Sequence, residues 1–150
     1  MEAIKNIEKA VGQFKQAKES LVADLKGQFE KVWEELFTAC PNLMRFTWNQ
    51  ATPGFNDGDP CYFSVHTPSV HIKIGEDEWE DAEPSDYASG TWQKQIIKKD
   101  PSLEAVEQMS SLIQGQAEEL MEDVYGNDQT ITISRQEDGT IKVETDDYYE

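Results

Sequence analysis

The sequence predicts an α+β protein in which two amphipathic helices, one of them long and N-terminal, pack on a small, mainly antiparallel sheet of about five strands. Three observations predict this class. Apolar residues recur at steps of three and four over residues 3–37, alternate with polar residues over 43–74, and return to helical spacing over 101–125. With 150 residues, 37% of them hydrophobic, we expect a single domain, 1–150, with its own core.

The long helix is expected within residues 1–40, and Lys18 interrupts its apolar stripe. That stripe comprises Ile4, Ile7, Val11, Phe14, Leu21, Leu25, Phe29, Val32 or Trp33, and Leu36. Pro41 should end the helix, because the residue before a proline avoids the α region. A break in the helix at Gly27 is an alternative, because glycine lowers the stability of a helix by about 1 kcal/mol relative to alanine. The heptad-like spacing suggests that the first half projects and pairs as a homodimer, and packing on the second helix of the same chain is the alternative.

Residues 43–74 are expected to form a three-strand meander. The alternation runs through Met44, Phe46 and Trp48, then Cys61, Phe63 and Val65, then Val70, Ile72 and Ile74. Turn-forming residues fill 51–60, and Thr67-Pro68 should turn the chain into the third strand.

Residues 75–90 are expected to be an acidic loop, because they hold seven acidic residues and no basic one. Asp100-Pro101 supplies a helix N-cap and first residue, so a helix over 101–125 should follow and stop at Gly126-Asn127. Apolar and polar residues alternate on both sides of 136–139, which predicts a hairpin over residues 129–145. Residues 146–150 are expected to form an acidic tail.

The charge excludes several classes of function. The net charge is −17, and over residues 42–150 seven basic residues face 23 acidic ones. A protein that grips nucleic acid directly needs a basic face to release counterions, and docking on anionic lipid needs one too. No apolar run is long enough to span a membrane, and the first residues lack a basic segment followed by an apolar one. We therefore expect a cytoplasmic protein that binds neither nucleic acid nor membrane directly.

Catalytic and metal-binding signals are weak. The sequence contains no GxGxxG, GxxxxGK[ST], HExxH or GxSxG motif. His66 and His71, on neighbouring predicted strands with Asp57 or Asp59 nearby, could form a metal or acid–base site, but both fit the solvent face of a sheet equally well. Residues 56–59 lack the EF-hand spacing, and Cys40 and Cys61 are expected to be buried or half-buried thiols. We expect no enzyme, no cofactor and no metal site.

One segment, residues 48–66, resembles a known group of proteins. Its residues Trp48 to Phe63 match the string W-x-Q-x-T-P-x-F-N-D-G-D-x-C-x-F, found between two strands in small acidic, mostly phage-encoded proteins of unknown function. The resemblance implies a phage origin and carries no catalytic residue. Physically the segment is expected to be a corner in which Pro53 and Gly54 turn the chain and Asp57 and Asp59 accept backbone hydrogen bonds.

An acidic protein without catalytic residues can act by presenting carboxylates where a partner expects phosphates. We expect an inhibitor of a host nucleic-acid-handling or defence protein, which occupies that protein's basic nucleic-acid-binding cleft as a DNA mimic. The carboxylates expected to bind the partner are Asp57, Asp59, Glu76, Asp77, Glu78, Glu80, Asp81, Glu83, Asp86, Glu118, Glu119, Glu122 and Asp123, and the acids of the tail, 146–150, are expected on the same negative surface. Trp79 and Tyr87 would anchor the contact. The alternatives are a protein-binding adaptor or regulator that uses apolar helix faces, and a small-ligand or metal-binding enzyme.

Overall fold

A computed structural model describes residues 1–54, 58–85 and 90–148 and confirms the α+β class. The long helix, α1, runs unbroken from Glu2 to Ala39, so Gly27 does not interrupt it. Arg135 closes its C-terminal end by donating from one guanidinium nitrogen to the carbonyl oxygens of Phe37 (2.6 Å) and Cys40 (3.1 Å). A cation at this position satisfies carbonyls that no helical N–H can reach.

The strands form one six-stranded antiparallel sheet with β1 at its centre. Its strands are β1 (Leu43–Ala51), β2 (Ser64–Val65), β3 (Ser69–Lys73), β4 (Trp79–Ala82), β5 (Gln129–Arg135) and β6 (Ile141–Asp147). The order is β4-β3-β1-β5-β6, with β2 also paired to β1. The C-terminal hairpin therefore joins the same sheet as the middle strands.

The middle strands do not form the expected meander. β2 and β3 do not pair with each other but follow one another along the same side of β1, with Val65 opposite Gln50 and Val70 opposite Phe46. Thr67-Pro68 therefore interrupts the pairing along one side of β1 and does not reverse the direction of the chain. A proline cannot donate to the ladder, which explains why the pairing breaks there.

The acidic segment 75–90 is not only a loop, because Trp79–Ala82 pair with β3 as the edge strand β4. Trp79 stacks on His71 of β3, with ring centroids 5.4 Å apart and planes 7° from parallel. This cross-strand aromatic contact supports a strand whose charges alone would favour solvent.

The helix expected over 101–125 is split. A π-helical segment, η1 (Trp92–Ile97), precedes the 3₁₀ turn η2 (Pro101–Leu103), then α2 (Glu104–Gln114) and α3 (Glu118–Tyr125) follow. Asp100 caps this region, as predicted, by accepting from the Ser102 N–H at 3.2 Å. The split lies at Gly115, where a Cβ would come within 2.9 Å of the Ser111 carbonyl oxygen. Gly126, with φ of 93°, ends α3 as predicted.

The hairpin formed by β5 and β6 confirms the prediction. Its strands pair in continuous register from Arg135, opposite Ile141, to Gln129, opposite Asp147. The strand β6 reaches Asp147, so the first two residues of the expected acidic tail belong to the sheet.

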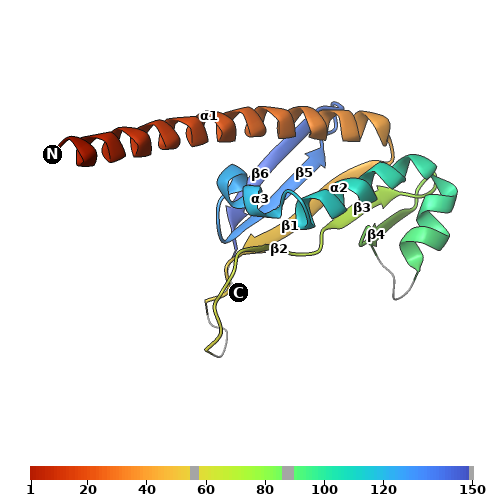
Figure 1. Cartoon of the computed structure of the whole chain (residues 1–150). Coiled ribbons are helices and arrows are strands. Elements are labelled where there is room, and N and C mark those ends of the chain that lie inside the picture. Colours follow the sequence, from red (N-terminus) through yellow and green to blue (C-terminus); the bar gives the residue numbers. More distant parts are fainter. Residues whose placement is uncertain (55–57, 86–89, 149–150) are drawn as a thin grey trace.

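The helices cover one face of the sheet and leave the other face open (Figure 1). On the covered face, Trp33 of α1 packs on Phe46 and Trp48 of β1, with ring centroids 5.2 and 5.6 Å away. Its Nε1 donates to the Tyr125 hydroxyl of α3 at 2.8 Å. Trp33 is fully buried and joins α1, β1 and α3.

Gln50 is a fully buried polar residue within this apolar layer. Its Nε2 donates to the carbonyl oxygens of Met121 (2.9 Å) and Gly126 (2.6 Å), and its Oε1 accepts from Trp48 Nε1 (2.9 Å). The side chain therefore ties the end of β1 to α3 and satisfies two buried groups, on Trp48 and Met121, and one partly buried carbonyl, on Gly126.

We predict that Gln50→Leu lowers the free energy of unfolding by at least about 2 kcal/mol, because it leaves buried donors and acceptors unpaired. The measurement is urea unfolding followed by tryptophan fluorescence. Gln108→Leu, on the exposed side of α2, serves as the control and should change stability by less than about 0.5 kcal/mol. Equal effects of the two substitutions would contradict this role of Gln50.

Burial raises the pKa of the Tyr125 phenol above its ordinary value of 10.0. Because the unfolded phenol then loses its proton first, the stabilisation is complete below pH 10 and declines as the pH rises through the folded-state pKa. We predict that the stability difference between the natural chain and Tyr125→Phe shrinks above pH 10. Urea unfolding of both proteins at pH 8 and at pH 10.5 tests this, and a difference that stays constant would contradict it.

Candidate binding surfaces

The N-terminal half of α1 extends away from the rest of the molecule (Figure 1). Residues 1–21, called here the projecting segment, are all exposed. Five large apolar side chains on it, called the apolar seam, are between 46% and 70% exposed: Ile4, Ile7, Val11, Phe14 and Leu21. The expected projection is therefore confirmed for this half, whereas the second half packs on the body from Leu25 onward.

The seam points to the same side of α1 as the residues that anchor the helix, because its steps of three and four continue through Leu25 and Phe29 to Trp33. Lys18 lies in the seam, and its Nζ is 3.7 Å from Asp123 Oδ1 of α3. The projecting segment thus overhangs the end of the body at which α3 lies.

The predicted partner-binding carboxylates divide into two groups. The sheet order places β4 at one edge, whereas α3 contacts α1, α2 and the short strand β2. The acids around β4 and those of α3 therefore lie in different parts of the molecule and do not form one surface. Asp57, Asp86 and Tyr87 lie outside the described residues.

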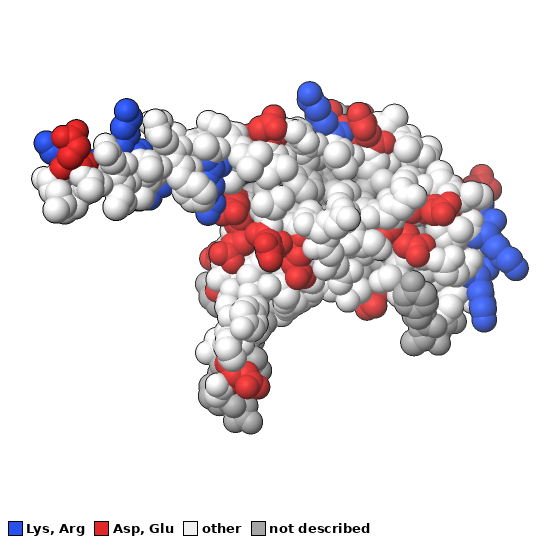
Figure 2. Space-filling view, viewed as in Figure 1, with Lys and Arg blue, Asp and Glu red and all other residues white. Residues whose placement is uncertain are grey.

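The first group, called the acidic end, gathers where α3, the loop after β1 and the end of β6 meet. Three hydrogen bonds hold this region together: Val65 N–H to Glu118 Oε2 (3.1 Å), Thr52 N–H to Asn127 Oδ1 (2.9 Å) and Tyr148 N–H to the Asp128 carbonyl (2.9 Å). The segments that meet here carry the acids Asp59, Glu118, Glu119, Glu122, Asp123, Asp128, Asp146 and Asp147, and the loop after β1, which carries Asp59, extends away from the body (Figure 1). Figure 2 shows acidic side chains gathered on α3 below the projecting helix.

The second group borders β4 and is partly neutralised. Asp81 Oδ1 lies 2.8 Å from His71 Nδ1 and 3.8 Å from the Arg45 guanidinium, while Lys73 Nζ sits 5.7 Å from the centre of the Trp79 ring. Trp79 is thus an element of the β3–β4 contact on the open face of the sheet. It does not lie beside the α3 acids as an anchor for the same partner.

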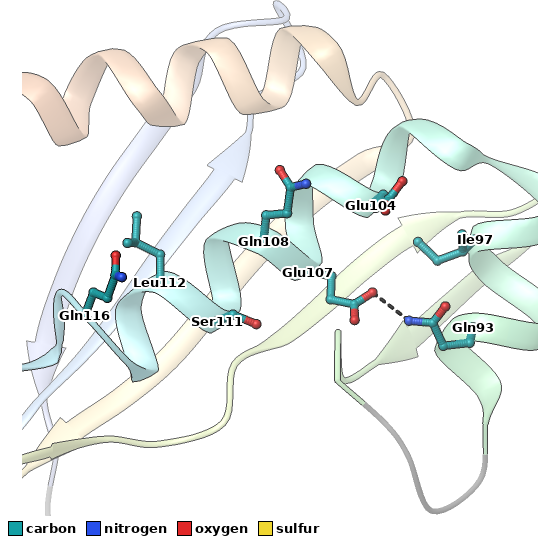
Figure 3. Close-up of a pocket in the computed structure, with 8 residues that line it drawn as sticks. All are labelled: Gln93, Ile97, Glu104, Glu107, Gln108, Ser111, Leu112 and Gln116. Atoms are coloured by element: carbon teal, nitrogen blue, oxygen red, sulfur yellow. Dashed lines mark hydrogen bonds between the residues drawn. The ribbon is translucent and has the colours of Figure 1, made fainter.

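A groove of about 560 Å³ runs between η1 and α2 (Figure 3). Its lining residues are Gln93, Ile97, Glu104, Glu107, Gln108, Ser111, Leu112 and Gln116. The Glu107 carboxylate already accepts from Gln93 Nε2 (2.7 Å) and Trp92 Nε1 (3.1 Å). A carboxylate held this way orients η1 on α2.

The two histidines are not brought together. His71 pairs with Asp81, and His66 makes an edge contact with the Tyr148 ring at 5.7 Å. Within 1–54, 58–85 and 90–148, no group of three His, Cys, Asp or Glu side chains is placed to hold a metal ion. Among the described residues, none of the helices combines the length and the apolar character of a membrane span.

Sequence reasoning missed Asp128, whereas the tail acids Asp146 and Asp147 are among the residues expected on this surface. The hairpin register sets Asp147 opposite Gln129, shortly after α3. That register was readable from the alternation of 130–134 and 140–144. Tyr62, 73% exposed on the loop between β1 and β2, is an aromatic side chain at this end.

Comparisons with protein-family models, with curated proteins and with solved structures found no match. The binding surfaces are therefore interpreted from their own geometry.

Both cysteines are free, Cys40 buried and Cys61 half-buried, as expected from the sequence. Burial raises the pKa of the Cys40 thiol, whose Sγ donates to the Ser102 carbonyl at 3.2 Å. A buried thiol with a raised pKa reacts slowly, because the thiolate is the nucleophile.

We predict that a small thiol reagent modifies Cys61 quickly in the folded protein and modifies Cys40 only after denaturant is added. Counting modified thiols by mass spectrometry over time tests this. Cys61→Ser should abolish the fast phase, and modification of both thiols at one rate would contradict the burial of Cys40.

Proposed function

We propose that this protein is a non-enzymatic inhibitor, encoded by a phage, that acts in the host cytoplasm by nucleic-acid mimicry. The acidic end occupies the basic nucleic-acid-binding cleft of a host defence or nucleic-acid-handling protein. The observation that carries the proposal is the run of four carboxylates on α3, with four further acids on the loop after β1, on the segment before β5 and at the end of β6.

The spacing of these charges suits such a role. Glu118 and Glu119 lie one helical turn, about 5.4 Å, before Glu122 and Asp123. A nucleic-acid strand carries one phosphate per about 3.4 Å of helix axis, so the two charge densities are of the same order. A basic cleft that binds these carboxylates releases counterions as it does with DNA, and association is steered by charge.

An aromatic side chain supplies the contact that charge alone lacks. Tyr62 is exposed on the loop that carries Asp59 at the acidic end, and tyrosine is enriched among residues that dominate binding energy. Tyr62, and not Trp79, is therefore the aromatic anchor of the proposed contact. The resemblance of residues 48–66 to phage-encoded proteins supports the choice of a host protein as the partner.

A second candidate function is favoured by the apolar seam. In this second function, the protein is an adaptor or regulator that binds a partner through this helix face without mimicry. Its complex would withstand salt, because apolar burial is not screened by ions.

The test is capture of proteins from a bacterial lysate on the tagged chain, with washes at low salt, at high salt and with excess duplex DNA. We predict capture of a nucleic-acid-binding protein that is lost with salt and with DNA. The triple variant Glu119→Gln, Glu122→Gln and Asp146→Asn should reduce capture about tenfold or more, because it removes three exposed charges of the acidic end.

The matched control is Glu76→Gln, Asp77→Asn and Glu83→Gln, which makes the same change in net charge beside β4 and should leave capture within about twofold. Equal losses in the two variants would contradict a specific acidic end. A complex that survives high salt and DNA, and is lost on Val11→Glu, would establish the adaptor function in place of mimicry.

A further inference from the structure

The apolar seam has the geometry of one strand of a two-stranded coiled coil. Ile4, Val11 and Lys18 occupy heptad position a, and Ile7, Phe14 and Leu21 occupy position d. We propose that the occupant of the seam is a second copy of this chain, packed antiparallel along the whole projecting segment. The proposal does not depend on what the acidic end binds.

One antiparallel register matches every apolar layer. In such a pair an a residue of one helix faces a d residue of the other. When Val11 faces the partner's Phe14, Ile4 faces the partner's Leu21, and Ile7 lies along the aliphatic stem of the partner's Lys18. Twofold symmetry repeats each layer, so six layers use all the seam residues.

The flanking positions agree with this register. At the e positions Glu8 faces the partner's Lys15, so two pairs of opposite charge form in each dimer. At the g positions Ala10 faces the partner's Ala17, and these small side chains let the two backbones approach. The projecting segment therefore carries complementary charges at its e positions and small side chains at its g positions.

The neighbouring antiparallel registers are disfavoured, because they bring like charges together and either leave an apolar residue uncovered or require one that is already packed. A shift of seven residues in one direction sets Glu8 against the partner's Glu8 and leaves Leu21 uncovered. The same shift in the other direction sets Lys15 against the partner's Lys15. It also requires Leu25, which already packs on the core of its own chain. Only the register centred between Val11 and Phe14 fits the exposed length of the helix.

The parallel arrangement is disfavoured by the distribution of charge. It would bring Lys18 against the partner's Lys18 in the seam and set the two bodies side by side. The projecting segment has four lysines and three acidic residues, so the net charge of −17 is carried by the bodies. The antiparallel pair instead separates the bodies by the segment length of about 32 Å, well beyond the Debye length of about 8 Å.

The partner helix also meets a complementary surface on the body. Because Lys18 of heptad position a reaches Asp123 of α3, the N-terminal turn of the partner's helix lies toward α3 in this register. Asp123 of α3 already attracts a lysine of its own chain there. The positive end of a helix dipole is stabilised by such carboxylates.

The first experiment measures mass in solution by size-exclusion chromatography with light scattering. We predict twice the chain mass of 17.1 kDa for the natural protein. Val11→Glu with Phe14→Glu should yield the monomer with an unchanged near-ultraviolet circular dichroism spectrum, because both residues lie outside the core. Gln13→Glu with Gln16→Glu adds the same charges on the outer side of the helix and should remain a dimer. A monomeric natural protein overturns the proposal.

The second experiment determines orientation by disulfide formation in a Cys61→Ser background. Ala10→Cys mixed with Ala17→Cys should give a cross-linked dimer of the two variants, whereas neither variant alone should cross-link. Within one chain the two positions lie about 10 Å apart, too far for a disulfide. Cross-linking of Ala10→Cys with itself, or equal yields from the outer pair Gln13→Cys and Gln16→Cys, overturns the antiparallel register.

Charge exchange gives an independent check on the register. Glu8→Lys and Lys15→Glu should each raise the dissociation constant of the dimer several-fold, because each places two like-charged pairs at the e positions. The double variant should restore the natural value. Additive weakening in the double variant would contradict the pairing of Glu8 with the partner's Lys15.

Discussion

The structure depends on the burial of Trp33 between helix and sheet. Its ring packs on Phe46 and Trp48 of β1, and its indole N–H is satisfied by the Tyr125 hydroxyl. These contacts fix the C-terminal half of α1 to β1 and α3 at once. Because a helix is stiff over this length, the same contacts also set the direction of the N-terminal half, which touches little of the body itself. The exposed seam is therefore held in place by an anchor some 20 residues away from its centre.

The projecting half of α1 differs from the body in both charge and apolar exposure. The projecting segment is nearly neutral and exposes large apolar side chains, whereas the body is strongly acidic and buries its own. A soluble surface rarely exposes a row of such side chains without a partner. An acidic surface, in contrast, is itself soluble. Self-association through the seam and partner recognition through the acidic end thus rest on different interactions, and the two surfaces adjoin at Asp123.

The sequence was sufficient to predict the elements whose signal is local. The period of the long helix, the capping Asp100 with Pro101, and the alternation of the last two strands each depend on residues a few positions apart. The features it could not predict depend on distant contacts. The acidic residues around Trp79 form a strand because they pair with β3, where Trp79 stacks on His71. The same holds for the acidic surface, since sheet order and not composition decides which acids become neighbours.

The antiparallel register has a consequence for the acidic end. If the N-terminal turn of a partner's helix lies toward α3, Asp123 and its neighbours lie at the edge of the dimer contact. Asp59, Tyr62 and Asp146, which come from the loop after β1 and from β6, are carried by other elements of that end. A dimer would then hold its two acidic ends beside the two ends of the paired helices. The like-charge repulsion between them would be screened over the distance that the paired helices impose. A single basic cleft would engage one end at a time, so binding to two separate copies of the target is the natural stoichiometry of such an assembly.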